Sequence, residues 1–253
     1  MMSGGTEFSS HFYSLSRDTI DEIRRAIKEV LPAGQGVSAN DAISALVNVA
    51  VAQCLECPAP GDPPSGLLQR TKAAIFGAHK PQLKVFEHMG AADVRPRLKM
   101  DPENAYCGSA IVLYTSNIPL DELQGPVTPR MLALVATATR KGTDSIDKGY
   151  IYAHAATIAK EPDCTMRPFA YGTGPPAHLV MTNHSRIGHY HVDFGWGTPV
   201  WANVIEETMS SLCYVLPPPP GRDGNVIHMM IPKDVQTRMQ QLPFWKDKTK
   251  LIR

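Results

Sequence analysis

The sequence lacks an excess of charge of either sign. Its 253 residues include 25 Lys and Arg against 24 Asp and Glu, which leaves a formal net charge of +1. This balance provides no long-range attraction for nucleic acid or for an anionic membrane surface. No apolar run reaches the ~18 residues that a membrane span needs, and the N-terminal stretch has no apolar signal-peptide core. We therefore expect a cytoplasmic protein that binds neither nucleic acid nor a membrane.

Cysteine pairs and cofactor motifs are also scarce. The chain has five cysteines, and an odd number favours reduced thiols over a disulfide framework. Cys54 and Cys57 have CxxC spacing, but neither a second pair nor a histidine at zinc spacing accompanies them. Residues 171–174 contain GxG, but Pro175 and Pro176 replace the helix start that would hold a phosphate. The sequence therefore predicts no metal and no bound cofactor.

Helical and strand-like patterns along the chain predict an α/β fold. Residues 18–31 carry apolar side chains at helical spacing, and Ser38 precedes a second helix with Asp41 at the capping-box position. Residues 109–118 form an apolar, β-branched run that is typical of a strand buried on both faces. Further helices are expected at 129–140, 144–158 and 232–241, and further strands at 178–183, 200–205, 212–216 and 226–231.

Three details of this pattern matter for the architecture. Gly142 separates two of the expected helices, and Pro232 is expected at the first position of the last one. The PPPPG segment at 217–221 forces a stiff turn between two strands. Because strands occur both with and without an intervening helix, we expect a mixed β-sheet flanked by helices.

The most specific motif is DFGWG at residues 193–197. Four other stretches precede it: SANDAISALV at 38–47, DVRPRL at 93–98, YCGS at 106–109 and TNH at 182–184. Together they resemble the BAHD-type (HXXXD) acyltransferases, in particular fungal members, over nearly the whole chain. That family transfers acyl groups from coenzyme A to hydroxyls or amines. The resemblance implies that residues 1–253 form one domain, the C-terminal lobe of a two-lobe enzyme with a chloramphenicol-acetyltransferase-like fold.

The chain departs from the family pattern at specific places. The family's HHxxxDG motif, whose histidine is the general base, has no counterpart in these 253 residues. The Trp-Arg pair that ends the first stretch in the family is Asn48-Val49 here, and the Asn of its YFGN motif is Ser109. The Trp of its TSW motif is His184. These changes argue against ordinary handling of acyl-coenzyme A.

The resemblance implies a structural role for the DFGWG motif. Its aspartate, Asp193, is expected to hold a loop through an arginine, for which Arg95 and Arg97 are the candidates. The two glycines are expected to supply unusual φ angles, and the tryptophan is expected to fill the core. These glycines are Gly195 and Gly197, and the tryptophan is Trp196.

Three of the nine histidines lie within eight residues, at His184, His189 and His191. We interpret the HxxxD match at 189–193 as a chance match, because an extended segment would separate its ends by ~13 Å. The resemblance implies that the TSW strand lies along the substrate channel, where an imidazole could hydrogen-bond a carbonyl or move a proton. The three histidines are thus the candidate catalytic residues, with Thr182 and Tyr190 as candidate substrate-binding residues. A partly exposed polar strand edge is the structural alternative.

Three functions remain compatible with the sequence. The first hypothesis is a cofactor-free cyclase of secondary metabolism, in which a pocket inherited from an acyltransferase orients a hydrophobic small molecule. The second is an acyl-coenzyme A-dependent acyltransferase completed by a partner or a second lobe. The third is a non-catalytic binding protein. A lobe that evolved against another lobe is also expected to expose an apolar face, which a homodimer could bury.

Overall fold

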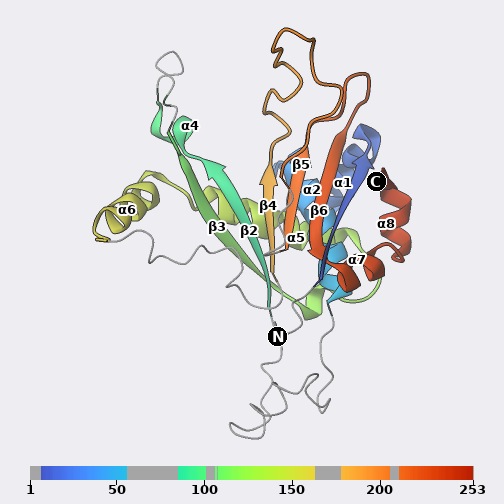
Figure 1. Cartoon of the computed structure of the whole chain (residues 1–253). Coiled ribbons are helices and arrows are strands. Elements are labelled where there is room, and N and C mark those ends of the chain that lie inside the picture. Colours follow the sequence, from blue (N-terminus) through green and yellow to red (C-terminus); the bar gives the residue numbers. More distant parts are fainter. Residues whose placement is uncertain are drawn as a thin grey trace, which may run out of the picture.

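Seven strands of the computed structural model form one mixed sheet (Figure 1). The structure describes residues 7–55, 85–100, 106, 108–162, 178–205 and 211–252. The strand order is β3-β2-β4-β5-β6-β1-β7, and the pairs β2–β4 and β4–β5 are parallel while the others are antiparallel. The strands are β1 (Phe8–Leu15), β2 (Val85–Asp93), β3 (Ile111–Pro119), β4 (His178–Asn183), β5 (Leu212–Leu216), β6 (Asn225–Pro232) and β7 (Lys250–Leu251).

Three long helices pack on one face of this sheet. Helices α1, α2 and α5 contact one another, and α2 is buried along almost its whole length; Figure 1 shows the three helices behind the strands. Its Ile43, Leu46 and Val47 join one core with β-strand residues such as Phe86 and Cys213. The helices are α1 (Arg17–Val30), α2 (Ala39–Cys54), α4 (Arg95–Leu98), α5 (Pro129–Asp144), α6 (Lys148–Ala159), α7 (Lys233–Met239) and α8 (Pro243–Lys248), with a 3₁₀ turn at η1 (Asp121–Leu123).

The opposite face of the sheet has its own small clusters of buried side chains. Met89, Val180, Leu212 and Met230 form one cluster, and all four come from strands. Phe12, Leu216 and Val226 form another. The helix-covered face therefore supplies most of the core, and the other face is lined by side chains of neighbouring strands.

The α/β class and the mixed, helix-flanked sheet predicted from the sequence are confirmed. Strands are present at 178–183 and 212–216 as expected, and β6 extends the expected strand 226–231 by one residue at each end. The capping box of α2 is also confirmed, because Ser38 Oγ accepts from the Asp41 amide and the Asp41 carboxylate accepts from the Ser38 amide.

Several element predictions were wrong, each for a tertiary reason. The strand expected to be buried on both faces is β3, an edge strand whose side chains alternate between buried and exposed. Helix α5 runs through Gly142, where an added Cβ would lie 2.4 Å from Ser116 Oγ, so this glycine permits close packing on β3. Pro232 is the N-cap of α7, not its first residue. Residues 200–205 form no strand, and β1 and β2 were not predicted.

Candidate functional site

A cleft opens where two parallel strands of the sheet part. β2 pairs with β4 only as far as Gly90 and Met181, and both strands continue beyond this point. Figure 1 shows β2 and β3 leaning away from β4 at this end of the sheet. The resulting cleft has a volume of about 400 Å³, within the ~300–1,000 Å³ of small-molecule sites. It therefore has the size of a ligand site, at a place that the backbone topology creates.

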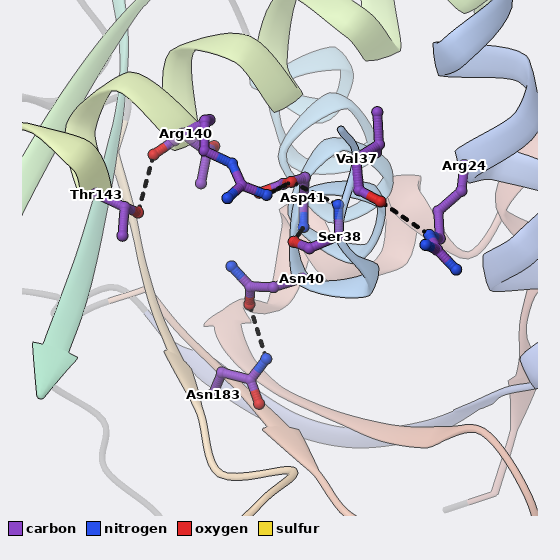
Figure 2. Close-up of polar contacts among 9 residues, drawn as sticks. Arg24, Val37, Ser38, Asn40, Asp41, Arg140, Thr143 and Asn183 are labelled. Carbon is purple, nitrogen blue, oxygen red and sulfur yellow. Dashed lines mark hydrogen bonds and ion pairs between the residues drawn. The ribbon is translucent and has the colours of Figure 1, made fainter. Parts of the chain in front are cut away.

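The start of α2 forms one wall of the cleft. Ser38, Asn40 and Ser44 line it from this helix, and the capping box holds the first turn in place. An ion pair between the buried Asp41 carboxylate and Arg140 of α5 fixes the turn from the other side (Figure 2). The N-terminal end of a helix carries a partial positive charge. This wall therefore combines hydroxyl and amide groups with a field that favours anions.

Side-chain contacts connect the start of α2 to its neighbours. Asn183 Nδ2 donates to Asn40 Oδ1 at 2.7 Å, which joins the end of β4 to the first turn of α2 (Figure 2). On the other side, Arg24 Nε of α1 donates to the carbonyl oxygen of Val37 at 3.0 Å. These contacts fix the start of α2 against the end of β4 on one side and against α1 on the other.

Two arginines add positive charge to the cleft. Arg97 donates to the carbonyl oxygens of Asp93 and Thr143, each at 3.1 Å, and Arg186 follows β4 in the turn that borders the opening. In the described part of the chain neither guanidinium is paired with a carboxylate. Their charge is therefore available to an anionic ligand.

On the face without the long helices, four aromatic or polar side chains form a row across the strands. The register places Thr182 beside Tyr214, Tyr214 beside His228, and His228 beside Phe12. The rings of Phe12 and His228 stack with centroids 4.0 Å apart, and Ser10 Oγ lies 2.9 Å from His228 Nε2. Thr182 also lines the cleft. The row therefore continues from the cleft across the face of the sheet.

His184 lies at the β4 end of this row, next to His189. Its ring meets Tyr214 edge-on at 5.3 Å between centroids, and the His189 ring centroid is 5.9 Å away. Burial lowers the pKa of His184, and the neighbouring His189 lowers it further. A neutral imidazole can accept a proton or donate a hydrogen bond near pH 7. The structure thus brings Thr182, His184 and His189 together, as three of the five predicted site residues.

The other two predicted site residues have different surroundings. The chain after His184 makes successive tight turns, with His189 N donating to Ile187 O and His191 N donating to Gly188 O. His189 and His191 are therefore not on one extended face, and His191 is exposed. Tyr190 Oη accepts from the Ala202 amide at 3.2 Å and joins two parts of the loop. The extended conformation assumed for residues 189–191 was wrong because turn hydrogen bonds replace a strand ladder.

The DFGWG segment differs most from its predicted surroundings. The Asp193 carboxylate is exposed, and its Oδ1 accepts from the Gly195 and Gly197 amides at 2.7 and 3.0 Å. Both glycines have φ near the left-handed region, at 97° and 96°, as the motif predicts. Trp196 is 92% exposed, so the prediction that it fills the core was wrong. The motif closes a loop on itself, because the backbone amides already satisfy the carboxylate.

The two arginines proposed as partners of Asp193 are bound elsewhere. Arg95 pairs with Asp93 at 3.1 Å and donates to the carbonyl oxygens of Tyr106 and Gly108. Arg97 donates to backbone carbonyls, as described above. The expected arginine pair of Asp193 is therefore wrong in this structure, since both guanidinium groups stabilise the turn that follows β2.

Sequence reasoning missed one buried residue of the cleft, His88. This side chain of β2 is 1% exposed and lines the cleft. Its partner is Asn48 of α2, forty positions earlier in the chain. The alternation of Phe86, His88 and Gly90 is a signal for a strand that would have placed the imidazole on an interior face.

Two features are absent from the described residues. Within them, no group of three or more His, Cys, Asp or Glu side chains is arranged to hold a metal ion. No helix among them has the length and apolar character required to cross a bilayer. Cys57 and the GxG segment at 171–174 lie outside the described residues.

Solved structures with the same fold define the class of protein. TRI101 of F. sporotrichioides, complexed with coenzyme A and T-2, superposes with a TM-score of 0.75 at 19% identity, over 99% of this chain and 52% of that chain. Vinorine synthase gives a TM-score of 0.54 at 15% identity, over 94% of this chain and 47% of that chain. At these identities the likeness shows the fold alone, and the chain matches about half of each of these structures.

The sequence comparisons give the family. Residues 66–241 match the family described as "Transferase family", and the chain belongs to it. Hydroxycinnamoyltransferase 2 of Oryza sativa subsp. japonica is 31% identical over 136 residues, which are 54% of this chain and 29% of that protein. The 13-O-acetyltransferase AT1 of Papaver somniferum, which acts on (13S,14R)-1,13-dihydroxy-N-methylcanadine, is 29% identical over 136 residues, or 27% of its length.

These findings confirm that the chain is homologous to the BAHD-type acyltransferases. The chain spans about half the length of the solved relatives, and its alignments cover less than a third of the curated ones. Its assignment to a fungal branch and to the C-terminal lobe remains a prediction.

Proposed function

We propose that this chain is the acyl-donor-binding lobe of an acyltransferase, and that coenzyme A thioesters bind in the cleft between β2 and β4. The observation that carries this proposal is the cleft itself: it joins a helix N-terminus, two arginines that have no carboxylate partner among the described residues, and a strand end that carries Thr182. A coenzyme A thioester has phosphates at one end and a long, mostly neutral arm at the other. Positive groups at the opening and a narrow interior suit both parts of such a molecule.

The chemistry of acyl transfer assigns roles to the side chains beside the cleft. An acceptor hydroxyl attacks the thioester carbonyl carbon, the new C–O bond forms, the C–S bond breaks, and the hydroxyl proton must pass to a base. In this proposal Thr182 Oγ1, which lines the cleft, and the neutral imidazole of His184, which packs against Tyr214 beside it, hydrogen-bond the oxygen that becomes negative in the transition state. The predicted substrate-binding role of Thr182 and the predicted catalytic role of His184 are thus retained in this proposal.

The general base of the proposed reaction lies outside these residues. The printed sequence contains no HHxxxDG segment, and removal of a general base typically costs ~10²–10⁴-fold in rate. We therefore expect these 253 residues alone to bind the acyl donor without steady turnover. The base is then contributed by a second lobe, and the exposed loop 187–205 is the surface that we expect this lobe to cover.

The cyclase hypothesis has no supporting observation. The two curated relatives named above are a hydroxycinnamoyltransferase and an O-acetyltransferase by name, and no feature of the described cleft favours a ring-forming reaction over acyl transfer. A hydrophobic acceptor molecule remains the expected second substrate, because apolar side chains such as Ile43 and Met181 accompany the polar groups of the cleft.

Isothermal titration calorimetry with coenzyme A and acetyl-coenzyme A tests the proposal. The chain should bind both, and Arg186→Ser should weaken binding of both by about tenfold because it removes one charge-assisted contact. Arg222→Ser, in the turn between β5 and β6, is the matched control and should bind as the parent does. Absence of coenzyme A binding by the parent would refute the proposed function.

A further inference from the structure

A buried histidine nitrogen faces the cleft and has no partner in the part of the chain that the structure describes. His88 is 1% exposed, and its Nε2 has no hydrogen-bond partner there. The imidazole lines the cleft from the centre of β2. An unsatisfied buried polar group costs about 1–3 kcal/mol. A side chain in this position is therefore suited to a bound molecule or a water that supplies the missing partner.

The contacts of Asn48 determine which nitrogen of His88 carries the proton. Asn48 Nδ2 donates to the carbonyl oxygen of Ser44 at 2.6 Å, and a carbonyl can only accept. This contact fixes the orientation of the amide. Nδ2 has a second hydrogen for either His88 Nδ1 at 3.1 Å or Met181 Sδ at 3.5 Å, and the nitrogen is the stronger acceptor. The alternative contact from His88 Nδ1 to Asn48 Oδ1 is longer, at 3.3 Å. His88 Nδ1 is therefore the acceptor, and Nε2 carries the proton.

The surroundings of His88 also keep the ring neutral. Burial lowers its pKa to about 4, so the imidazole is uncharged at neutral pH. Its neighbours are the aromatic ring of Tyr114, with centroids 5.8 Å apart, and the thioether of Met181 beside Asn48. A neutral N–H donor in apolar surroundings favours a neutral acceptor oxygen over a carboxylate or phosphate, whose desolvation costs far more.

We propose that His88 is a substrate-contacting residue whose Nε2–H donates a hydrogen bond to a carbonyl oxygen of the acyl-pantetheine arm of the bound thioester. This inference rests on the proposed function and names the polar contact in the interior of the cleft. The carbonyl comes either from the thioester or from one of the pantetheine amides, which present the same neutral oxygen. Asn48 is then a positioning residue, because it sets the tautomer and orientation of the imidazole.

Calorimetry with three probes tests this contact. Acetyl-coenzyme A, coenzyme A and S-ethyl-coenzyme A share the pantetheine amides, and only acetyl-coenzyme A has a thioester carbonyl. His88→Leu should weaken the binding of acetyl-coenzyme A by about tenfold. Equal weakening of all three probes assigns the bond to an amide, and weakening of acetyl-coenzyme A alone assigns it to the thioester. His88→Gln, whose amide nitrogen can replace Nε2, should restore part of the affinity.

Further measurements keep the test independent of variant stability. In the parent protein at pH 7, long-range ¹H–¹⁵N spectra should show the Nε2–H tautomer of His88, and acetyl-coenzyme A should shift that signal. Asn48→Leu should convert His88 partly to the other tautomer and weaken binding, whereas His154→Gln on the exposed face of α6 should change neither. Parent binding that is unaffected by His88→Leu, with an unshifted His88 signal, overturns the contact alone. A parent that binds none of the three probes overturns the proposed function, and this inference with it.

Discussion

Asp193 shows how a residue of a recognisable motif can have unexpected surroundings. A buried carboxylate paired with arginine would be very sensitive to loss of charge. In the structure the carboxylate is exposed and accepts two amides of its own loop through a single oxygen. The aspartate therefore shapes the loop locally and does not connect it to β2.

Two substitutions in this loop distinguish shape from charge. Asp193→Asn keeps the accepting oxygen and should change the free energy of unfolding by less than about 0.5 kcal/mol. Gly197→Ala must adopt a φ of 96° with a Cβ and should cost about 1 kcal/mol or more in loop stability. Urea unfolding of both variants provides the measurement. A large destabilisation by Asp193→Asn would instead support the pairing of Asp193 with an arginine that the sequence predicted.

His88 should make the stability of the protein sensitive to acid. Its pKa is about 4 in the folded protein, against an ordinary value of 6.5. Above pH 6.5 the imidazole is neutral in both states, and below it only the unfolded chain gains a proton until the pH approaches 4. The unfolding free energy should thus fall by roughly 3 kcal/mol across this window. Urea titrations at pH 7 and 5 should show a smaller loss for His88→Gln than for the parent, while His154→Gln should match the parent.

At the scale of elements, the pairing of β2 with β3 depends on a close approach between the two strands. Gly90 lies beside Tyr114 on β3, and an added Cβ would lie 2.3 Å from the ring. The phenol end of the ring lies over the glycine, and the ring is also next to Gly142 of α5 and the His88 imidazole. Glycine at this position therefore connects the edge of the sheet, the α5 helix and the cleft.

Gly90→Ala should destabilise the protein by about 1–3 kcal/mol, because the Tyr114 ring must leave its present position over the glycine and lose part of its packing. The double variant Gly90→Ala, Tyr114→Leu should recover part of this loss relative to Tyr114→Leu alone. Ala91→Ser, one residue along the same strand, is the control for substitution in β2. Thermal unfolding by circular dichroism measures all four variants, and additive effects in the double variant would contradict the contact.

At the scale of the whole molecule, exposed apolar side chains gather in one loop. Phe194, Trp196, Val200 and Ile205 are each at least 79% exposed, and all lie between β4 and β5. Exposed apolar patches of this kind mark interaction surfaces. The sequence predicted an exposed apolar face for a lobe that packs on another lobe, and this loop is the candidate for that face.

The fluorescence of two of the three tryptophans, Trp196 and Trp201, reports on this loop. Trp196 is 92% exposed and Trp201 39%, whereas Trp245 is 1% exposed and packs edge-on against Tyr13. At low protein concentration, acrylamide should strongly quench a fluorescence component that Trp196→Phe removes. Trp245→Phe should leave that component in place. If the quenching decreases as the protein concentration rises, copies of this chain cover the loop. If the component is protected from acrylamide even at the lowest protein concentration, the exposure of Trp196 is contradicted.

The sequence by itself determined the features that depend on neighbouring residues. The capping box of α2, the strands at 178–183 and 212–216, and the left-handed glycines of DFGWG follow from local backbone preferences. The polar character of Thr182 and His184 at a strand end also followed, because strand and motif coincide there. The order of helices and strands gave the α/β class and the mixed sheet. The family resemblance added the expectation of a chloramphenicol-acetyltransferase-like lobe.

The tertiary structure decided what depends on contacts between distant segments. The cleft exists because β2 and β4 part beyond Gly90 and Met181, and pairing register is a property of two strands, not of either sequence. The partnership of Asn48 with His88 spans forty residues, and a single sequence carries no record of such a contact. Burial of His88 and exposure of Trp196 likewise reverse what residue type suggests, because packing of neighbouring elements determines how much of each side chain meets water.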